Sequence, residues 1–258
     1  MKIGVLREIV SGESRVAATP ETVKKMIALS HSVLIEAGAG IQASISDEDY
    51  KNNGAEIVSR NLALQSDLLL MVRPLDEKEI ITLKPKQFMV GMLEPFNNDL
   101  QALLKKQGVS AFALEALPRN TRAQSMDVLS SQANIAGYKA VILAADYYKK
   151  FMPMLMTAAG TVKAAKVIVL GAGVAGLQAV ATAKRLGAVV EASDVRPSVQ
   201  EQIESLGGKF IEVPFETEEE KDCAIGKGGY AKPMPKSWLT RQSKVVAEKA
   251  KSADIIIT

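Results

Sequence analysis

Three glycines stand where a chain could hold the phosphates of a dinucleotide. Gly171, Gly173 and Gly176 form G-x-G-x-x-G directly after the apolar run Val167–Leu170. The first glycine permits a tight turn, the second lets the backbone approach a pyrophosphate, and the third lets a helix pack on the strand. The helix expected next would point its free N–H groups and its positive dipole end at that pyrophosphate. The predicted phosphate contacts are Gly171, Ala172, Gly173, Val174, Ala175 and Gly176.

An acidic residue follows the next β-rich run, as a nucleotide-binding unit requires. Asp194 lies roughly 20 residues after the glycine-rich turn, where a carboxylate can accept a hydrogen bond from a ribose 2′-hydroxyl and would repel a 2′-phosphate. A lone glycine motif is weak evidence because glycine turns are common, but here strand, turn, helix, second strand and acid occur in order. We therefore expect NAD(H) rather than NADP(H), bound by the turn and by Asp194, Val195 and Arg196.

Composition fits an enzyme-sized chain and excludes several other classes. The sequence has 258 residues, 47% of them hydrophobic, which is enough for one or two domains with a real core. The net charge of +3 is mild and the basic residues are dispersed, so nucleic-acid binding is not predicted. A single cysteine, Cys223, excludes intramolecular disulfides. The sequence contains no metal-binding motif and no apolar run near the ~18 to 20 residues that span a bilayer.

Short β-like runs alternate with helical segments in the first half of the sequence. The strand candidates are Lys2–Leu6, Ser32–Glu36, Asp67–Val72, Gln87–Gly91 and Val109–Leu114. Helices are predicted at Pro20–Leu29, Asp47–Asn53, Asp76–Ile81 and Asn98–Gln107. Alternation of this kind predicts a mostly parallel sheet with helices on its faces.

A long proline-free segment, Ser125–Lys150, is predicted to form one helix with Ser125 as its N-cap. It would join the first α/β unit to a second one that begins near Val162. The strand candidates there are Val167–Leu170, Ala188–Ala192, Lys209–Val213 and Asp254–Ile257. We expect an α/β fold of two Rossmann-like parallel-sheet domains, residues 1–140 and 141–258, with a cleft between them. Because such a domain usually has about six strands, we expect the second to be incomplete at its C-terminus.

The residues also resemble a known family. The segment VLGAGVAGLQAVATAKRLGAVVEASDVRP, together with SRVAATPETV near the N-terminus, resembles the alanine dehydrogenase and transhydrogenase α-subunit superfamily. Pro118–Val141 is similar to the NAD(H)-binding domain I of proton-translocating transhydrogenases, and Gly228–Pro235 is similar to the mobile loop of that domain. The resemblance covers nearly the whole chain, and domain I of the family continues beyond the point that corresponds to Thr258.

This resemblance implies hydride transfer between NADH and NADP⁺, coupled to proton movement through a membrane partner. NAD(H) would be bound by this chain and NADP(H) by a partner domain. The chain would form a homodimer, peripheral on the cytoplasmic or matrix side of an energy-transducing membrane. By the same resemblance, Tyr230 would cover the bound nucleotide, although its loop by itself is equally typical of disorder.

The residues that match the nicotinamide end of the family's site are Arg119, Gln124, Asp127 and Ser130. The last three are spaced three apart, so a helix would place them on one face, toward one ligand. Gln124 and Ser130 could hydrogen-bond a carboxamide or ribose, and Asp127 could orient the guanidinium of Arg119. The plainer alternative is a solvated polar start of a helix.

Two alternatives remain. The alanine dehydrogenase branch uses an arginine at the position of Arg15, a lysine after the third strand and a histidine after the fourth. Here Arg73 replaces the lysine, and the corresponding histidine is absent; the only histidine is His31. Oxidative deamination needs an acid/base group, whereas hydride exchange between nicotinamides needs positioning and exclusion of water. The pattern favours transhydrogenase over an amino-acid dehydrogenase or a non-catalytic NAD-binding chain.

Overall fold

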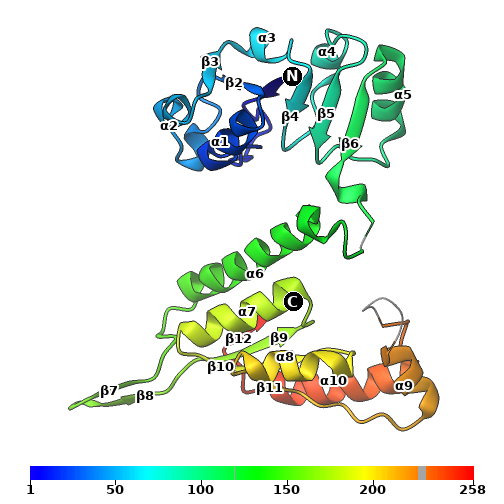
Figure 1. The fold of residues 1–258 in the computed structure, drawn as a ribbon. Helices are drawn as coiled ribbons and strands as arrows, with labels where there is room; N and C mark the ends of the chain where they lie inside the picture. Colours follow the sequence, from blue (N-terminus) through cyan, green and yellow to red (C-terminus); the bar gives the residue numbers. More distant parts are fainter. Residues whose placement is uncertain (119, 226–230) are drawn as a thin grey trace. The chain divides into compact units, whose positions relative to one another are not determined.

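The computed structural model describes residues 1–118, 120–225 and 231–258. The chain divides into two compact units, Met1–Val128 and Leu129–Thr258. Each unit is built around its own parallel sheet (Figure 1). Arg119 and Tyr230, two of the predicted site residues, lie outside the described residues.

The first unit contains a six-stranded sheet in which all neighbouring strands pair parallel. Its strands are β1 (Lys2–Val5), β2 (Ser32–Glu36), β3 (Glu56–Val58), β4 (Leu68–Leu70), β5 (Phe88–Gly91) and β6 (Ser110–Ala113). The spatial order is β3-β2-β1-β4-β5-β6, which is that of a doubly wound sheet. In such a sheet the strand order reverses beside the first strand, so the carboxyl ends of β1 and β4 flank the crevice where ligands commonly bind.

Helices cover both faces of this sheet. They are α1 (Pro20–Ala28), α2 (Asp47–Asn52), α3 (Arg60–Ala63), α4 (Glu77–Ile80) and α5 (Asn98–Gln107), with short 3₁₀ turns at Ile41–Ala43, Leu114–Ala116 and Gln124–Met126. Thr19 begins α1 with a reciprocal capping box to Thr22. Two separate apolar clusters result, one containing Val23 of α1 and the other Leu104 of α5. The sheet is therefore buried on both sides, as parallel sheets generally are.

The second unit has a four-stranded parallel sheet ordered β11-β10-β9-β12. Its strands are β9 (Lys166–Leu170), β10 (Val189–Ser193), β11 (Lys209–Phe210) and β12 (Ile255–Ile257). Its helices are α6 (Val128–Tyr147), α7 (Val174–Arg185), α8 (Gln200–Ser205), α9 (Glu218–Ile225) and α10 (Lys236–Ala250), with a 3₁₀ turn at Pro197–Val199. This order repeats the first four positions of the doubly wound pattern, with β9 in the place of β1.

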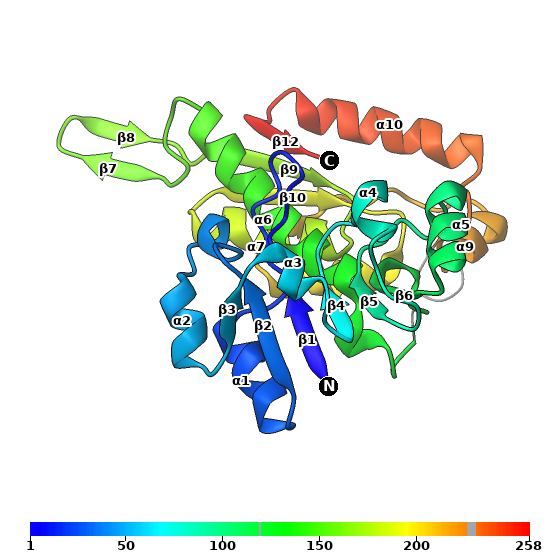
Figure 2. The same cartoon turned by 90° about the horizontal axis from the view of Figure 1, so that it is seen from above.

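A separate antiparallel hairpin precedes β9. It consists of β7 (Leu155–Thr157) and β8 (Gly160–Val162), with Met156 opposite Thr161. The hairpin extends away from the sheet and helices of its own unit, as both views of the fold show (Figures 1 and 2). All three residues of β8 are exposed, so the hairpin contributes little to the core of the second unit.

Strand alternation assigns the helices of this unit to two faces. Val190 and Ala192 of β10 are buried in a cluster with Val180 of α7. Glu191, which lies between them and points to the opposite face, pairs with Lys249 of α10 at 2.9 Å. Helix α7 therefore covers one face and α10 the other, as Figure 1 shows.

Helix α6 packs closely on the start of α7, and the contact lies within the second unit. A Cβ atom at Gly137 would overlap the backbone carbonyl of Ala175. Nearby, the Asn134 amide donates to the Gln178 side chain at 3.2 Å. A glycine is thus required at this crossing, because the obstacle is backbone and cannot rotate away.

The structure confirms the α/β class and the parallel sheets predicted from sequence. It adds β3, α3 and the β7–β8 hairpin, which are too short or too exposed to give a clear pattern. The predicted N-cap role of Ser125 is wrong, since Ser125 lies inside a 3₁₀ turn and the α-helix begins at Val128. Among the residues described, no helix is both long and apolar enough to cross a membrane.

Replacing Gly137 with alanine is expected to destabilise the second unit. Overpacking costs about 1 to 3 kcal/mol, and the better helix propensity of alanine returns only about 1 kcal/mol of it. The difference is about 0 to 2 kcal/mol, and because the clash is with backbone we expect the upper half of that range as a loss of unfolding free energy, measured by chemical denaturation. Ile135→Ala, at a position 56% exposed on the same helix, is the control and should cost less. Equal stabilities for the two variants would contradict this packing.

Candidate functional site

The glycine-rich turn connects β9 to α7 at the carboxyl end of the second sheet. Gly171 has φ of 92°, a left-handed conformation that side chains rarely adopt. A Cβ atom at Gly176 would overlap the carbonyl oxygen of Gly171, so the third glycine allows α7 to start directly against the turn. The two glycines together fix the direction in which α7 leaves the strand.

Gly173 has a different environment from the other two glycines. It is the N-cap residue of α7, its φ is −76°, and a Cβ atom there would meet nothing within 4 Å. The fold therefore does not need a glycine at this position. Open space next to the first amide groups of a 12-residue helix is what a pyrophosphate requires, since those N–H groups have no partner within the helix.

Asp194 follows β10 and faces the same turn. Its Oδ2 accepts a hydrogen bond from the backbone N–H of Ala172 at 2.7 Å. Arg196 donates to Oδ1 from its backbone N–H at 2.8 Å and from Nε at 2.9 Å, and its guanidinium also reaches Oδ2 at 2.9 Å. The carboxylate thus joins the end of β10 to the turn after β9.

These donors decide the charge of the acid. Burial of Asp194 by itself raises the pKa, but the hydrogen bonds from Arg196 and Ala172 outweigh it and hold the pKa below its ordinary value. The same pair raises the pKa of Arg196. Asp194 is therefore ionised at neutral pH.

A hollow of about 310 Å³ opens beside this acid. Its lining combines the carboxyl ends of β9 and β10 with one face of α10: Leu170, Gly171, Ser193, Asp194, Val195, Leu239, Gln242, Ser243 and Val246. Ser193 is buried, and among the described residues its Oγ has no hydrogen-bond partner. A mixed apolar and amide wall with an unsatisfied hydroxyl suits the base and ribose of a nucleotide.

The α10 side of this hollow was not predicted from the sequence. Leu239, Gln242, Ser243 and Val246 lie more than 40 residues beyond the acid in an amphipathic pattern that any surface helix shows. Their position depends on how α10 is anchored. Trp238 is buried and stacks on Phe215 with ring centroids 5.9 Å apart, which fixes the start of the helix.

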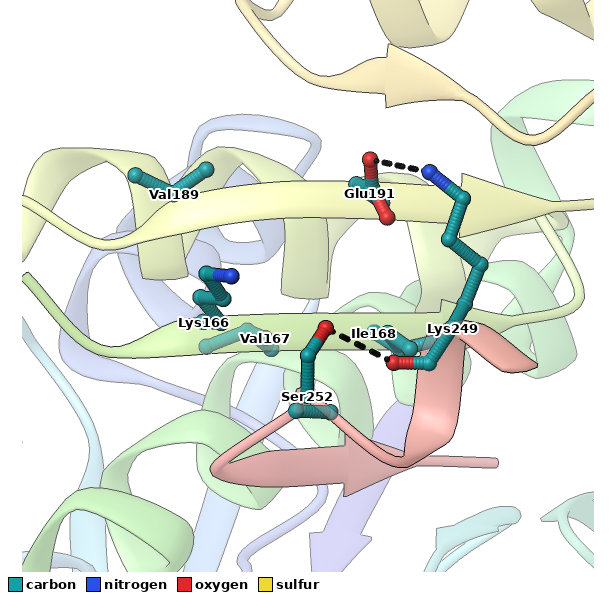
Figure 3. A pocket seen from close by; sticks show the side chains of 8 residues that line it. Lys166, Val167, Ile168, Val189, Glu191, Lys249 and Ser252 are labelled. Carbon is teal, nitrogen blue, oxygen red and sulfur yellow. Dashed lines mark hydrogen bonds and ion pairs between the residues drawn. The ribbon is translucent and has the colours of Figure 1, made fainter. Parts of the chain in front are cut away.

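A second hollow, of about 140 Å³, lies on the same face of the sheet but toward the start of its strands (Figure 3). Lys166 and Val189, which line it, are the first residues of β9 and β10. Figure 3 shows Lys249 reaching Glu191 across this hollow, which ties the end of α10 to the sheet. Ligands of open parallel sheets bind at the carboxyl ends of the strands, so the first hollow is the candidate site.

The predicted nicotinamide residues are arranged differently from what was expected. Gln124 is exposed in a 3₁₀ turn, and Asp127 is half-buried just after it with ψ of 87°, outside the helical region. Ser130, also half-buried, lies in the first turn of α6. The expectation that all three share one helix face is therefore wrong, because the backbone break at Asp127 separates Gln124 from the helix.

The first unit has a cluster of compensated charges at the carboxyl ends of β1 and β4. Arg15 donates to Glu13 from Nε at 2.7 Å and from a terminal nitrogen at 2.6 Å, and Arg73 donates to it at 3.3 Å. The hydrogen bond from Arg15 lowers the pKa of Glu13 to about 2. Beside them, the Glu8 carboxylate accepts from the backbone N–H of Val72 at 2.6 Å. The chain's own carboxylates thus fill this edge.

These features place the protein in the doubly wound class of α/β proteins, with a second unit shaped for a dinucleotide. The N-terminal domain of the alanine dehydrogenase/PNT family matches residues 4–136, and the C-terminal domain of that family matches residues 140–258. The chain therefore belongs to the alanine dehydrogenase/PNT family.

Similar proteins and structures point in the same direction. Over its whole length the chain is 46% identical to the first of the NAD(P) transhydrogenase alpha-subunit polypeptides of Rhodospirillum rubrum and covers 68% of that protein. A transhydrogenase structure from Sinorhizobium meliloti superposes on 99% of this chain and 68% of its own, with a TM-score of 0.87 and 43% identity. An L-alanine dehydrogenase structure superposes on 93% of this chain and 71% of its own, with a TM-score of 0.71 and 26% identity. The chain spans about half the length of other curated relatives.

Alanine substitutions at two glycines of the turn should separate ligand binding from folding. Gly173→Ala adds a methyl group in open space at the N-terminus of α7, so the fold should be kept while NADH affinity falls at least tenfold. Gly176→Ala creates a backbone clash and should lower the midpoint of thermal unfolding markedly. Circular dichroism melts and fluorescence titration with NADH measure the two effects. If the Gly173→Ala variant binds NADH as tightly as the unsubstituted chain, the pyrophosphate does not lie against Gly173.

Proposed function

We propose that the chain is the NAD(H)-binding component of a proton-translocating transhydrogenase. In this function hydride passes between NADH and NADP⁺ held by another component, and proton movement through a membrane component is coupled to it. The observation that carries the proposal is the open N-terminus of α7 beside the ionised Asp194, in a chain 46% identical to a transhydrogenase α subunit.

In this proposal the described residues bind most of the dinucleotide. The pyrophosphate would lie on the turn Gly171–Gly176, with the adenosine ribose near Asp194 and the base in the hollow beside Gln242. Bound NADH supplies a hydride from C4 of its nicotinamide. The protein's part in that reaction is to bind and orient NADH and to exclude water, because hydride exchange needs no acid or base.

The nicotinamide end is assigned by family resemblance alone. In this proposal Arg119, Gln124, Asp127 and Ser130 hold that end, and Tyr230 covers the bound nucleotide. The backbone leaves the helical conformation at Asp127. We propose that residues on either side of this break contact the ligand from a loop rather than from one helix face.

Two structural observations disfavour an amino-acid dehydrogenase. A carboxylate substrate would need Arg15, whose guanidinium is held by Glu13 through two hydrogen bonds. The only histidine, His31, precedes β2 and so lies at the amino ends of the parallel strands, at the edge opposite to the usual ligand site. Pyruvate-dependent oxidation of NADH would restore this alternative, and an NADH dissociation constant in the millimolar range would favour a non-catalytic chain.

We further propose that the functional assembly is a homodimer associated with NADP(H)-binding and membrane components. It would lie on the cytoplasmic face of an energy-transducing membrane or on the matrix face in an organelle. The names of the relatives as subunits support a complex of several components. A pull-down with a separately purified NADP(H)-binding component tests this assembly directly.

Cofactor selectivity is the first expected property. The chain should bind NADH more tightly than NADPH, because a 2′-phosphate meets the Asp194 carboxylate and loses the ribose hydrogen bond. Together these effects should cost about 2 to 4 kcal/mol, or roughly 30- to 1,000-fold in affinity. Titration of nicotinamide fluorescence with each reduced cofactor measures the ratio. Equal affinities would contradict the assignment of Asp194.

A substitution at Gln124 should change the rate of hydride transfer more than the affinity for NADH. Gln124→Asn shortens a side chain that would touch only the nicotinamide end, so NADH affinity should change less than about fivefold. Transfer requires the two carbons to approach to about 3 to 3.5 Å, where a 1 Å displacement can cost about 100-fold. We therefore expect single-turnover transfer at least tenfold slower, measured by stopped flow after reconstitution with the NADP(H)-binding component.

The matched control for that experiment is Gln42→Asn. Gln42 is also exposed in a 3₁₀ turn of the first unit, but it lies far from Gln124 in the sequence and has no predicted role. Its transfer rate should equal that of the unsubstituted protein. If Gln124→Asn also transfers hydride at the unsubstituted rate, Gln124 has no part in positioning the nicotinamide.

A further inference from the structure

The ion pair between Asp194 and Arg196 is more extensive than binding a ribose requires. We propose that Arg196 is a latent ligand for a nucleotide 2′-phosphate, kept engaged by Asp194, so that the pair rather than the acid alone selects NADH over NADPH. The proposal rests on the function proposed above, because it assumes that the adenosine end of NADH lies in the hollow beside Asp194.

The hydrogen bonds on Asp194 fill the acceptor capacity of its carboxylate. A carboxylate offers about four lone-pair sites. The backbone N–H of Ala172, the backbone N–H of Arg196, its Nε and one terminal nitrogen occupy them at 2.7 to 2.9 Å. A ribose hydroxyl must therefore displace or share one of these donors. The guanidinium is the displaceable one, since the two backbone donors are fixed by the turn and by the end of β10.

Charge alone does not explain why this position would favour NADH over NADPH. The Arg196 guanidinium lies 2.9 Å from the Asp194 carboxylate, so the pair presents little net charge to an incoming phosphate. The Arg196 side chain is 22% exposed and that of Asp194 only 6%, so the cation is the member of the pair that solvent reaches. A 2′-phosphate is excluded chiefly because the carboxylate fills the space and because the guanidinium is already bound.

Removal of the carboxylate would leave a phosphate site in its place. The vacated position would be surrounded by the backbone N–H groups of Ala172 and Arg196 and by the fork of the Arg196 guanidinium. Arginine matches phosphate oxygens with two parallel hydrogen bonds, and backbone N–H groups are common phosphate donors. The structure thus already contains the donors that an NADPH site needs, without an added basic residue.

The test compares Asp194→Ala with the double variant Asp194→Ala/Arg196→Gln. Affinities for NADH and NADPH are measured by fluorescence titration, and adenosine 2′,5′-bisphosphate is compared with 5′-AMP to isolate the adenosine end. We expect Asp194→Ala to bind NADPH at least tenfold more tightly than the unsubstituted chain and NADH at least tenfold more weakly. The double variant should lose the gain for NADPH and for the bisphosphate.

Glu191→Ala is the matched control, because Glu191 lies on β10, three residues before Asp194, and also carries an ion pair, to Lys249. It should leave the preference for NADH unchanged. If loss of the bond to Ala172 prevents Asp194→Ala from folding, Asp194→Ser keeps a hydroxyl acceptor and should show the same gain. No gain for NADPH in the folded single variant, or a gain that survives removal of Arg196, would overturn the inference.

The two proposals fail in different ways. If the unsubstituted chain does not bind NADH, the proposed function fails whatever the variants do. If it binds NADH selectively and Asp194→Ala merely loses NADH, the proposed function stands and Arg196 is only a support that orients Asp194.

Discussion

The close approach of α7 to β9 is the constraint on which the candidate site depends. Gly176 lies so near the carbonyl of Gly171 that no side chain fits between helix and turn. This contact aims the N-terminus of α7 at the carboxyl edge of the second sheet, where the open position of Gly173 lies. The same turn places Ala172 within reach of Asp194, which fixes the end of β10. Helix α6 is then held against α7 by a second glycine contact, at Gly137.

The two sheets share the order of their first four strands but use their carboxyl edges differently. In the first unit, the chain's own side chains fill this edge: Glu13 binds Arg15 and Arg73, and Arg60 binds the buried Glu36. In the second unit, the corresponding edge carries a glycine turn with open space at Gly173. The carboxyl edge of either parallel sheet could bind a ligand, and the side chains at each edge decide whether space for one remains. This difference explains why we assign the nucleotide to the second unit.

Much of this arrangement could be predicted from the sequence. The β-like runs and the amphipathic helices identified the parallel α/β class, because buried strands and their covering helices have distinct periods. The glycine spacing and the acid after the second strand identified the turn. Short elements such as β3 and α3 were missed, since three or four residues do not establish a period. The start of α6 was misplaced because Ser125 and Asp127 are both common residue types at the start of a helix, and residue type alone does not choose between them.

The sequence by itself determined the kind of site, since the φ of Gly171 favours glycine and the contact at Gly176 leaves no room for a side chain, and both requirements are local. The tertiary structure decided the rest. It brought Gln242 of α10 to the end of β10, and it placed the backbone N–H of Ala172 within hydrogen-bond distance of Asp194. These contacts join residues far apart in the sequence, and they depend on how α10 crosses the sheet and on how the turn after β9 meets the end of β10. Packing of the whole unit fixes both.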